Sequence, residues 1–186
     1  MRLFISAPLP KNTKRELAKA REEFLEFPAK WVKEENFHIT LIFIGETKES
    51  EAKKVAEAID VATKDLNLIN LETDGLSLLP NEKRPRILAI KLTGETEKLP
   101  KLVGNIEKGL REREILRHVQ DKPFRPHVTL ARLKKLRSGE KKELREKIRF
   151  YNLPTIEFKA RRVELTESKL TPTGPVYKAL KRYTLP

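Results

Sequence analysis

The chain has 186 residues, a length that suits one domain or two small lobes around a shared core. It contains no cysteine, which excludes disulfides, thiolate metal sites and a cysteine nucleophile. The net charge is +13, and residues 94–186 supply most of it with 24 basic and 12 acidic side chains. Such a surface favours a polyanionic partner, although a solvated, lysine-rich face of a stable protein gives the same composition.

No apolar run approaches the roughly 18 residues that are needed to cross a bilayer. The first eight residues are too short for a targeting segment, so a soluble, cytoplasmic protein without a membrane partner is expected. The single Met and single Gln among many Lys and Glu residues favour a thermophilic source. A monomer is the default expectation.

The first half of the chain alternates between strand and helix patterns, read from apolar periods of two and of about 3.6 residues. In chain order the pattern predicts a strand over 2–7, a helix over 13–26, a strand over 37–44, a helix over 49–63, a strand over 66–71 and an extended stretch over 76–80. Thr13 and Glu16 have the spacing of a capping box, so the first helix is expected to begin at Thr13.

The second half repeats this alternation and ends in a hairpin. The pattern predicts a strand over 86–92, a helix over 95–117, a strand over 127–133, a basic helix over 139–150 and strands over 154–159, 161–169 and 175–184. Residues 171–174 (Thr-Pro-Thr-Gly) have the composition of a turn between the last two strands.

One tripeptide pattern occurs twice, each time at the head of a predicted strand. The copies are residues 38–40 (His-Ile-Thr) and 127–129 (His-Val-Thr). Side chains alternate along a strand, so the histidine and the threonine of each copy point to the same side. Each strand therefore presents an imidazole beside a hydroxyl. The third histidine, His118, lacks this pattern and is expected at the surface.

The two copies occupy equivalent places in a repeated order of elements. Each half reads strand, helix, His-x-Thr strand, helix, strand. This order predicts an internal duplication within a single domain, with pseudo-symmetric lobes of about 1–80 and 81–186 between which the chain is allowed to cross. A pseudo-twofold axis would then set the two motif strands against each other across a shared groove.

Two histidines in one polar groove suit a reaction that needs a general base and a general acid. Imidazole titrates near neutral pH, so one ring can be neutral while the other is protonated. Attack on a phosphodiester needs both proton transfers, and the charge that builds on the phosphate oxygens needs fixed donors. The hydroxyls of Thr40 and Thr129 are candidates for these donors. A 2′,3′-cyclic phosphate would need only water as the nucleophile, with no metal or cofactor.

The motifs and their flanks resemble the 2H phosphoesterases, and among them the RNA 2′,3′-cyclic phosphodiesterases once named 2′-5′ RNA ligases. The resemblance covers nearly the whole chain and rests on residues 2–6, 37–41, 124–132 and 165–177. It implies an α+β, bilobal fold, a pseudo-twofold duplication in which two antiparallel sheets line a central cleft with helices on the outside.

The resemblance also implies a reaction and its residues. The reaction is metal-free hydrolysis of a 2′,3′-cyclic phosphate end on RNA, such as a tRNA fragment, to a 2′-phosphomonoester. His38 would be the proton donor to the leaving 3′-oxygen, and His127 would be the base that activates water. The residues by themselves do not decide which histidine has which role. A weak, equilibrium-limited 2′-5′ ligation is implied as a side activity.

Two arginines near the second motif are candidate contacts to the substrate. Arg132 lies five residues after His127, so on a regular strand its side chain would face away from the histidine. A bulge or the strand end would turn it back. Arg125 shares the parity of His127 but precedes Pro126 in a predicted loop.

Two other functions remain open at this point. The chain could be a non-enzymatic, basic RNA-binding module with structural histidines. It could also be a metal-dependent phosphoesterase, although no cluster of histidine and acidic residues has a three-ligand spacing.

Overall fold

The computed structural model of the chain describes residues 1–115 and 123–186. His118 lies outside the described residues. The helix expected over 95–117 ends at Glu112, so its expected end was wrong: the chain turns at Arg113 and Glu114. Within the described residues no helix is long and apolar enough to cross a membrane.

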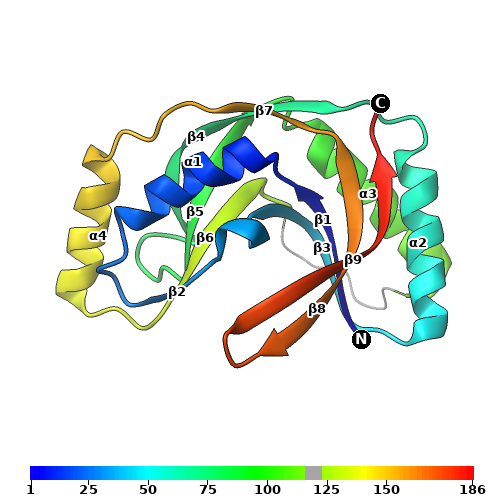
Figure 1. The fold of residues 1–186 in the computed structure, drawn as a ribbon, viewed down its shortest axis with the longest axis horizontal. Coiled ribbons are helices and arrows are strands. Elements are labelled where there is room, and N and C mark those ends of the chain that lie inside the picture. The colour runs from blue at the N-terminus through cyan, green and yellow to red at the C-terminus, as the bar shows by residue number, and fades with distance from the viewer. Residues whose placement is uncertain (116–122) are drawn as a thin grey trace.

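The strands of the described residues form one antiparallel sheet that curls around the molecule (Figure 1). Their order is β7-β4-β5-β6-β3-β1-β8-β9, and β2 pairs with β6. The strands are β1 (Arg2–Pro8), β2 (Ala29–Trp31), β3 (His38–Glu46), β4 (Ile69–Leu79), β5 (Ile87–Gly94), β6 (His127–Leu133), β7 (Glu157–Ala160), β8 (Arg162–Thr171) and β9 (Gly174–Thr184).

Two groups of four strands meet at the centre of this sheet. Ile39 of β3 lies opposite Val128 of β6, and this is the register pair that joins the groups. On one side of it are β3, β1, β8 and β9, and on the other are β6, β5, β4 and β7. Because β4 comes from the first half of the chain and β8 and β9 from the second, each group mixes strands from both halves.

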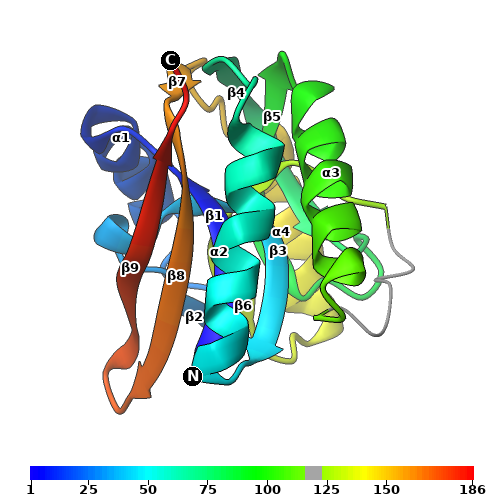
Figure 2. The same ribbon diagram turned by 90° about the vertical axis from the view of Figure 1, so that its right-hand side faces the viewer.

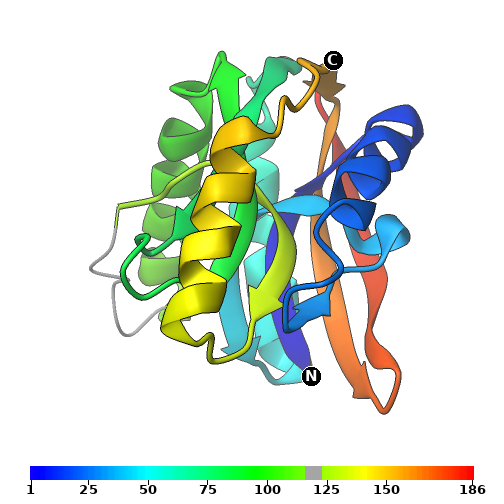
Figure 3. The same ribbon diagram turned by 90° about the vertical axis from the view of Figure 1, so that its left-hand side faces the viewer.

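Four α-helices in the described residues cover the sheet, each through one apolar stripe. They are α1 (Lys11–Glu22), α2 (Glu49–Thr63), α3 (Lys98–Glu112) and α4 (Ser138–Phe150), and a 3-10 turn, η1 (Glu34–Asn36), precedes β3. Helices α2 and α3 lie side by side on the outside of the group that contains β1 and β3 (Figure 2). Helix α4 lies on the opposite side of the molecule, beside the group that contains β4 and β5 (Figure 3).

The expected start of the first helix was wrong. Helix α1 begins at Lys11, directly after Pro10, and Thr13 lies inside its first turn with only 3% of its surface exposed. Pro10 is the N-cap residue, and its carbonyl accepts the first backbone hydrogen bond of the helix at 3.0 Å. The buried Thr13 side chain makes no cap hydrogen bond. A real cap of this kind occurs at α2, where the Glu51 carboxylate accepts a hydrogen bond from the Lys48 backbone N–H at 2.9 Å.

A second difference concerns β4. The stretches expected over 66–71 and 76–80 are parts of one strand, Ile69–Leu79, whose register against β5 shifts between Thr73 and Leu76. Gly75, with φ +77°, lies in this irregular segment, where only glycine adopts the conformation at no steric cost. The other expected elements are found with ends that differ by a few residues, and the α+β class with outer helices is confirmed.

Candidate active site

The register between β3 and β6 determines how the two motifs meet. Extended by one residue in each direction, it places His38 opposite Thr129 and Thr40 opposite His127. Side chains directly opposite each other on one face have Cβ atoms about 5 Å apart. The middle residue of each motif is fully buried on the other face, whereas these four are half-buried. The two predicted motifs therefore form one polar cluster.

Both histidine rings are held in the same way by the backbone. The Nδ1 atom of His38 lies 2.7 Å from the carbonyl oxygen of Asn36, and that of His127 lies 2.6 Å from the carbonyl oxygen of Arg125. A carbonyl can only accept, so Nδ1 carries the proton in both rings. In the neutral state each Nε2 atom therefore has a free lone pair directed away from its own backbone.

The two Nε2 atoms have different partners. The Nε2 atom of His38 accepts a hydrogen bond from the Thr40 hydroxyl at 2.8 Å. In the described part of the chain, the corresponding bond between His127 and Thr129 is not formed. The motifs are thus equal in backbone geometry and unequal in the side-chain contacts of their rings.

Aromatic side chains enclose His38. Its ring centroid lies 5.1 Å from that of Phe4 and 5.5 Å from that of Tyr177, which meets it edge-on at 83°. Asn36 ties this region to the final hairpin, because its side-chain amide donates to the carbonyl of Pro175 at 3.1 Å. Burial among these groups lowers the pKa of His38 to about 4, against the opposing effect of the Asn36 carbonyl.

Positive charges add to this shift. After burial, the nearby charges of Lys14, His127 and Arg132 lower the pKa of His38 further. Lys14 comes from α1, and its ammonium donates a hydrogen bond to the Glu35 carbonyl at 2.7 Å. Burial also lowers the pKa of Lys14 itself. Positive charge around a half-buried imidazole favours an anionic ligand.

A β-bulge in β6 brings Arg132 to the face that carries the motif. Ala131 and Thr129 pair with consecutive residues of β5, so Leu130 between them is the extra residue. Leu130 and Ala131 are both fully buried, and the exposed Arg132 follows them on the side of Thr129. Consistent with this position, the charge of Arg132 acts on His38.

Strand β3 has the same bulge, and there the position equivalent to Arg132 is occupied by Phe43. Leu41 is the extra residue in the register between β1 and β3. The Phe43 side chain is 53% exposed. The two motif strands thus present a guanidinium on one side and an aromatic ring on the other.

Several groups around the histidines were not predicted from the sequence. They are the backbone carbonyls of Asn36 and Arg125, the ring of Tyr177 and the ammonium group of Lys14. Lys91 is the register partner of His127, but its ammonium lies 3.9 Å from an aspartate carboxylate of β4. The side chain of Arg125 is exposed, and the contact that the structure gives this residue is made by its carbonyl. The carbonyls leave no signal in the sequence, because every residue carries one.

Among the described residues, no group of three histidine or acidic side chains lies close enough together to hold a metal ion.

The family match and the sequence relatives of the chain agree with each other. The family described as LigT like Phosphoesterase matches the chain twice, at residues 7–89 and 90–177. The RNA 2′,3′-cyclic phosphodiesterase of Methanocaldococcus jannaschii is 30% identical over 184 residues, which is 98% of this chain and 100% of the relative. The RNA 2′,3′-cyclic phosphodiesterase of Aeropyrum pernix is 35% identical over 155 residues, which is 82% of this chain and 84% of the relative.

Solved structures share the fold. The crystal structure of TT0787 from Thermus thermophilus aligns with a TM-score of 0.81 and 28% identity, covering 100% of this chain and 98% of that one. LigT of E. coli, crystallised with 3′-AMP, aligns with a TM-score of 0.76 and 19% identity over 99% and 97% of the two chains.

Proposed function

The chain belongs to the family of LigT-like phosphoesterases, and on that premise we propose that it is an RNA 2′,3′-cyclic phosphodiesterase. Relatives that match almost the full chain carry this name. The proposed substrate is an RNA that ends in a 2′,3′-cyclic phosphate, and the product is a 2′-phosphomonoester with a free 3′-hydroxyl. Water supplies the oxygen atom, so the reaction is a hydrolysis.

His127 is proposed as the base that activates water. Its Nδ1–H is held by the Arg125 carbonyl, which leaves the lone pair of Nε2 available for a proton. As the water oxygen bonds to phosphorus, Nε2 takes one proton from that water. The absence of a Thr129 bond to this ring in the described residues is in keeping with a role that needs an unoccupied Nε2 atom.

His38 is proposed as the proton donor. When the bond from phosphorus to the 3′-oxygen breaks, the Nε2–H of a protonated His38 gives its proton to that oxygen. With a pKa of about 4 the ring is neutral at neutral pH. A bound phosphate brings negative charge beside Lys14 and Arg132, which raises the pKa of His38 and allows it to take up the proton that it donates.

Thr40, Thr129 and Arg132 are proposed to hold the phosphate. Donors that are fixed before the reaction stabilise the charge that builds on the non-bridging oxygens. Once His38 is protonated, its Nε2 atom no longer accepts the Thr40 hydroxyl, so this hydroxyl becomes free to donate to a phosphate oxygen. Arg125 is proposed as a contact to the RNA strand outside the motif, since its side chain is exposed.

The observation that supports this function most strongly is the pair of Nδ1–carbonyl hydrogen bonds. Together with the register of β3 and β6, they present two Nε2 atoms in one polar cluster, in the tautomer that acid–base transfer needs. A purely structural role would not need two rings with the same tautomer on the open face.

The test is a product analysis in the presence of a chelator. An oligoribonucleotide with a 2′,3′-cyclic phosphate end is incubated with the wild-type protein and with the His38→Ala and His127→Ala variants. We expect a 2′-phosphate product from the wild type and a loss of activity by a factor of about 100 or more in each variant, as expected for loss of an acid or base. His118→Ala, which removes the histidine outside the motifs, serves as the matched control.

The same assay distinguishes the other two functions. Binding without turnover would support a non-enzymatic RNA-binding module. Turnover that returns only after a divalent metal is restored would support a metal-dependent enzyme. A 3′-phosphate product would contradict the proposed identity of the leaving oxygen.

A weak 2′-5′ ligation is proposed as a side reaction at the same site. The 5′-hydroxyl of a second RNA, such as a tRNA half, would attack phosphorus in place of water, the bond from phosphorus to the 3′-oxygen would break, and a 2′-5′ phosphodiester would form. Because water is in large excess, this joining would be limited by equilibrium. Action as a monomer in the cytoplasm stays a prediction.

A further inference from the structure

A basic hollow opens beside the proposed catalytic cluster. It has a volume of about 590 Å³, and its basic lining residues are Lys11 and Lys14 of α1 together with Lys159, Arg161 and Arg162 around the junction of β7 and β8. This junction and the first turn of α1 lie close together in the upper part of the molecule (Figure 1).

The hollow is continuous with the surroundings of His38. Pro8, which lines the hollow, is the register partner of His38 in the pairing of β1 with β3. The 3-10 turn η1 connects them a second time, because Glu34 and Glu35 line the hollow and the next residue, Asn36, holds Nδ1 of His38. Lys14 belongs to the hollow, and its charge acts on His38.

Most of the basic side chains that line the hollow form no ion pair in the described part of the chain. Within residues 1–115 and 123–186, Lys11, Lys159 and Arg161 form no ion pair, while Arg162 is paired with Glu164 at 2.8 Å. Lys14 bonds to a backbone carbonyl rather than to a carboxylate. Five basic side chains line the hollow against two acidic ones, and Glu164 beside Arg162 and Lys14 is a third carboxylate. The balance is still positive, so the hollow attracts an anion.

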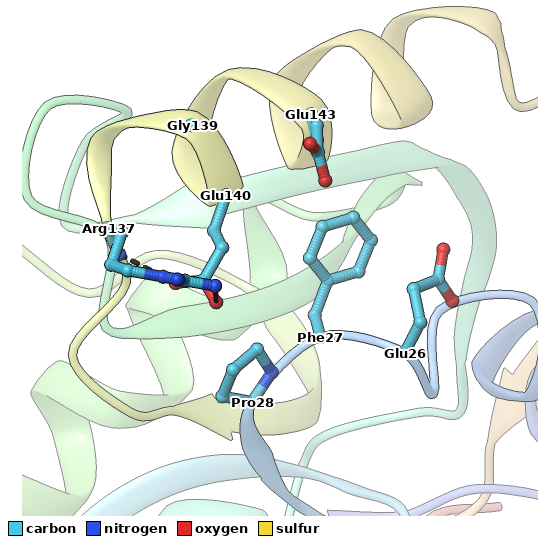
Figure 4. Close-up of a pocket in the computed structure, with 7 residues that line it drawn as sticks. All are labelled: Glu26, Phe27, Pro28, Arg137, Gly139, Glu140 and Glu143. Carbon is cyan, nitrogen blue, oxygen red and sulfur yellow. Dashed lines mark hydrogen bonds and ion pairs between the residues drawn. The ribbon is translucent and has the colours of Figure 1, made fainter.

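A second hollow, beside α4, has the opposite character (Figure 4). Its charged lining consists of Glu26, Glu140 and Glu143 with Arg137, and Arg137 is already paired with Glu140 at 3.0 Å. Glu26 is likewise paired, with Lys147 of α4. The described cations at this hollow are therefore already bound to carboxylates, although α4 itself belongs to a basic segment of the sequence. The charges of the lining residues thus distinguish the two hollows, which the net charge of the sequence does not do.

We propose that the basic hollow binds a backbone phosphate of the RNA on the 5′ side of the terminal nucleotide. This inference rests on the proposed function, since it assumes that the cyclic phosphate lies between His38 and His127. It identifies the substrate as an RNA strand of at least two nucleotides rather than a cyclic mononucleotide. Single-stranded RNA held by cations loses affinity as salt displaces it, with a slope of about 0.7 per phosphate contact.

The test compares two substrates with the same reacting end. One is 2′,3′-cyclic AMP, and the other is a trinucleotide that ends in adenosine 2′,3′-cyclic phosphate. The Lys159→Gln/Arg161→Gln variant removes two exposed cations of the hollow and leaves Lys14 in place, so the charge on His38 is kept. The matched control is Lys53→Gln/Lys108→Gln, which removes two exposed cations from α2 and α3.

For the trinucleotide we expect the KM of the hollow variant to rise about 10-fold at low salt, with kcat unchanged. The slope of its dependence on salt should weaken by about 0.7, the value for one phosphate contact. The KM for 2′,3′-cyclic AMP should stay within about twofold, and the control should resemble the wild type for both substrates. An equal change for both substrates, or no change for the trinucleotide, would overturn the proposal.

A binding measurement keeps this test separate from the proposed function. If the wild type turns over neither substrate, the proposed function fails. The affinity for a fluorescent trinucleotide with a 2′-phosphate end, measured by anisotropy, then tests whether the hollow binds a backbone phosphate. A loss of affinity in the hollow variant but not in the control supports the phosphate site, and equal affinity in all three proteins contradicts it.

Discussion

Ile39 and Val128 lie opposite each other where the two strand groups of the sheet meet. This one pair brings together two motifs whose histidines are 89 residues apart in the sequence. A shift of register by one residue would turn every side chain of one strand to the other face. The buried side chains of this pair therefore hold both histidines on the open face.

Removal of either motif hydroxyl should slow the reaction. Thr40→Val and Thr129→Val each delete one donor to the phosphate and keep the shape of the side chain. We expect kcat to fall on the order of 100-fold in each variant, as for loss of one donor in a preorganised anion site. Steady-state kinetics with the cyclic-phosphate trinucleotide measures this effect. Thr40→Ser and Thr129→Ser keep the hydroxyl and should retain most of the activity, and equal losses in the Ser and Val variants would argue against the donor role.

Product binding should raise the pKa of His38. Its pKa is about 4, because burial lowers it most and nearby positive charge lowers it further. A 2′-phosphate compensates those charges and favours the imidazolium. An NMR titration of the ring with and without 2′-AMP should show an upward shift of at least one pH unit. A pKa that stays near 4 in the complex would remove the proposed source of the donated proton.

Lys14→Gln should also raise the pKa of His38. The variant removes the positive charge that lowers the pKa of His38 most, and it leaves the ring enclosed by Phe4 and Tyr177. Lys11→Gln is the matched control, because Lys11 lies one turn earlier and is not among the charges that act on His38. The same NMR titration compares the two variants. An equal pKa in both would show that Lys14 is too far away or too well screened to matter.

The lowered pKa of His38 makes a predictable contribution to acid unfolding. Between the ordinary pKa of 6.5 and the folded value of about 4, the unfolded state binds a proton that the folded state does not. This contribution to stability is therefore complete above pH 6.5 and is lost as the pH falls toward 4, by up to roughly 1.4 kcal/mol per pH unit.

The His38→Asn variant lacks this titration. Its free energy of unfolding, measured by denaturant titration between pH 7 and pH 5, should fall less steeply than that of the wild type. Other groups titrate in both proteins and cancel in the comparison. Parallel curves would mean that His38 has the same pKa in the folded and unfolded states.

The sequence was sufficient for features that depend on local periodicity. The predicted range of the second motif strand, 127–133, agrees with β6, and the range 49–63 agrees with α2. The direction of the Arg132 side chain was not decided by the sequence, which left a bulge and the strand end as two ways to turn it toward the histidine. The observed bulge lies at Leu130.

Features that depend on long-range contacts could not be read in this way. Tyr177 reaches His38 from β9, and Lys14 acts on the same ring from α1. Neither residue has a periodicity or spacing that relates it to the motif. The start of α1 was misread because the capping-box pattern of Thr13 competes with Pro10, and burial of the Thr13 side chain decides against the cap.

The central claim, that His38 donates a proton to the leaving oxygen while His127 accepts one from water, is tested most directly by a change of leaving group. In a cyclic phosphate with sulfur in place of the 3′-oxygen, the leaving thiolate needs no proton, because a thiol has a pKa of about 8.5. The single-turnover rate on this substrate should be largely restored in His38→Ala and should stay low in His127→Ala. Restoration in His127→Ala instead, or in neither variant, would contradict the account.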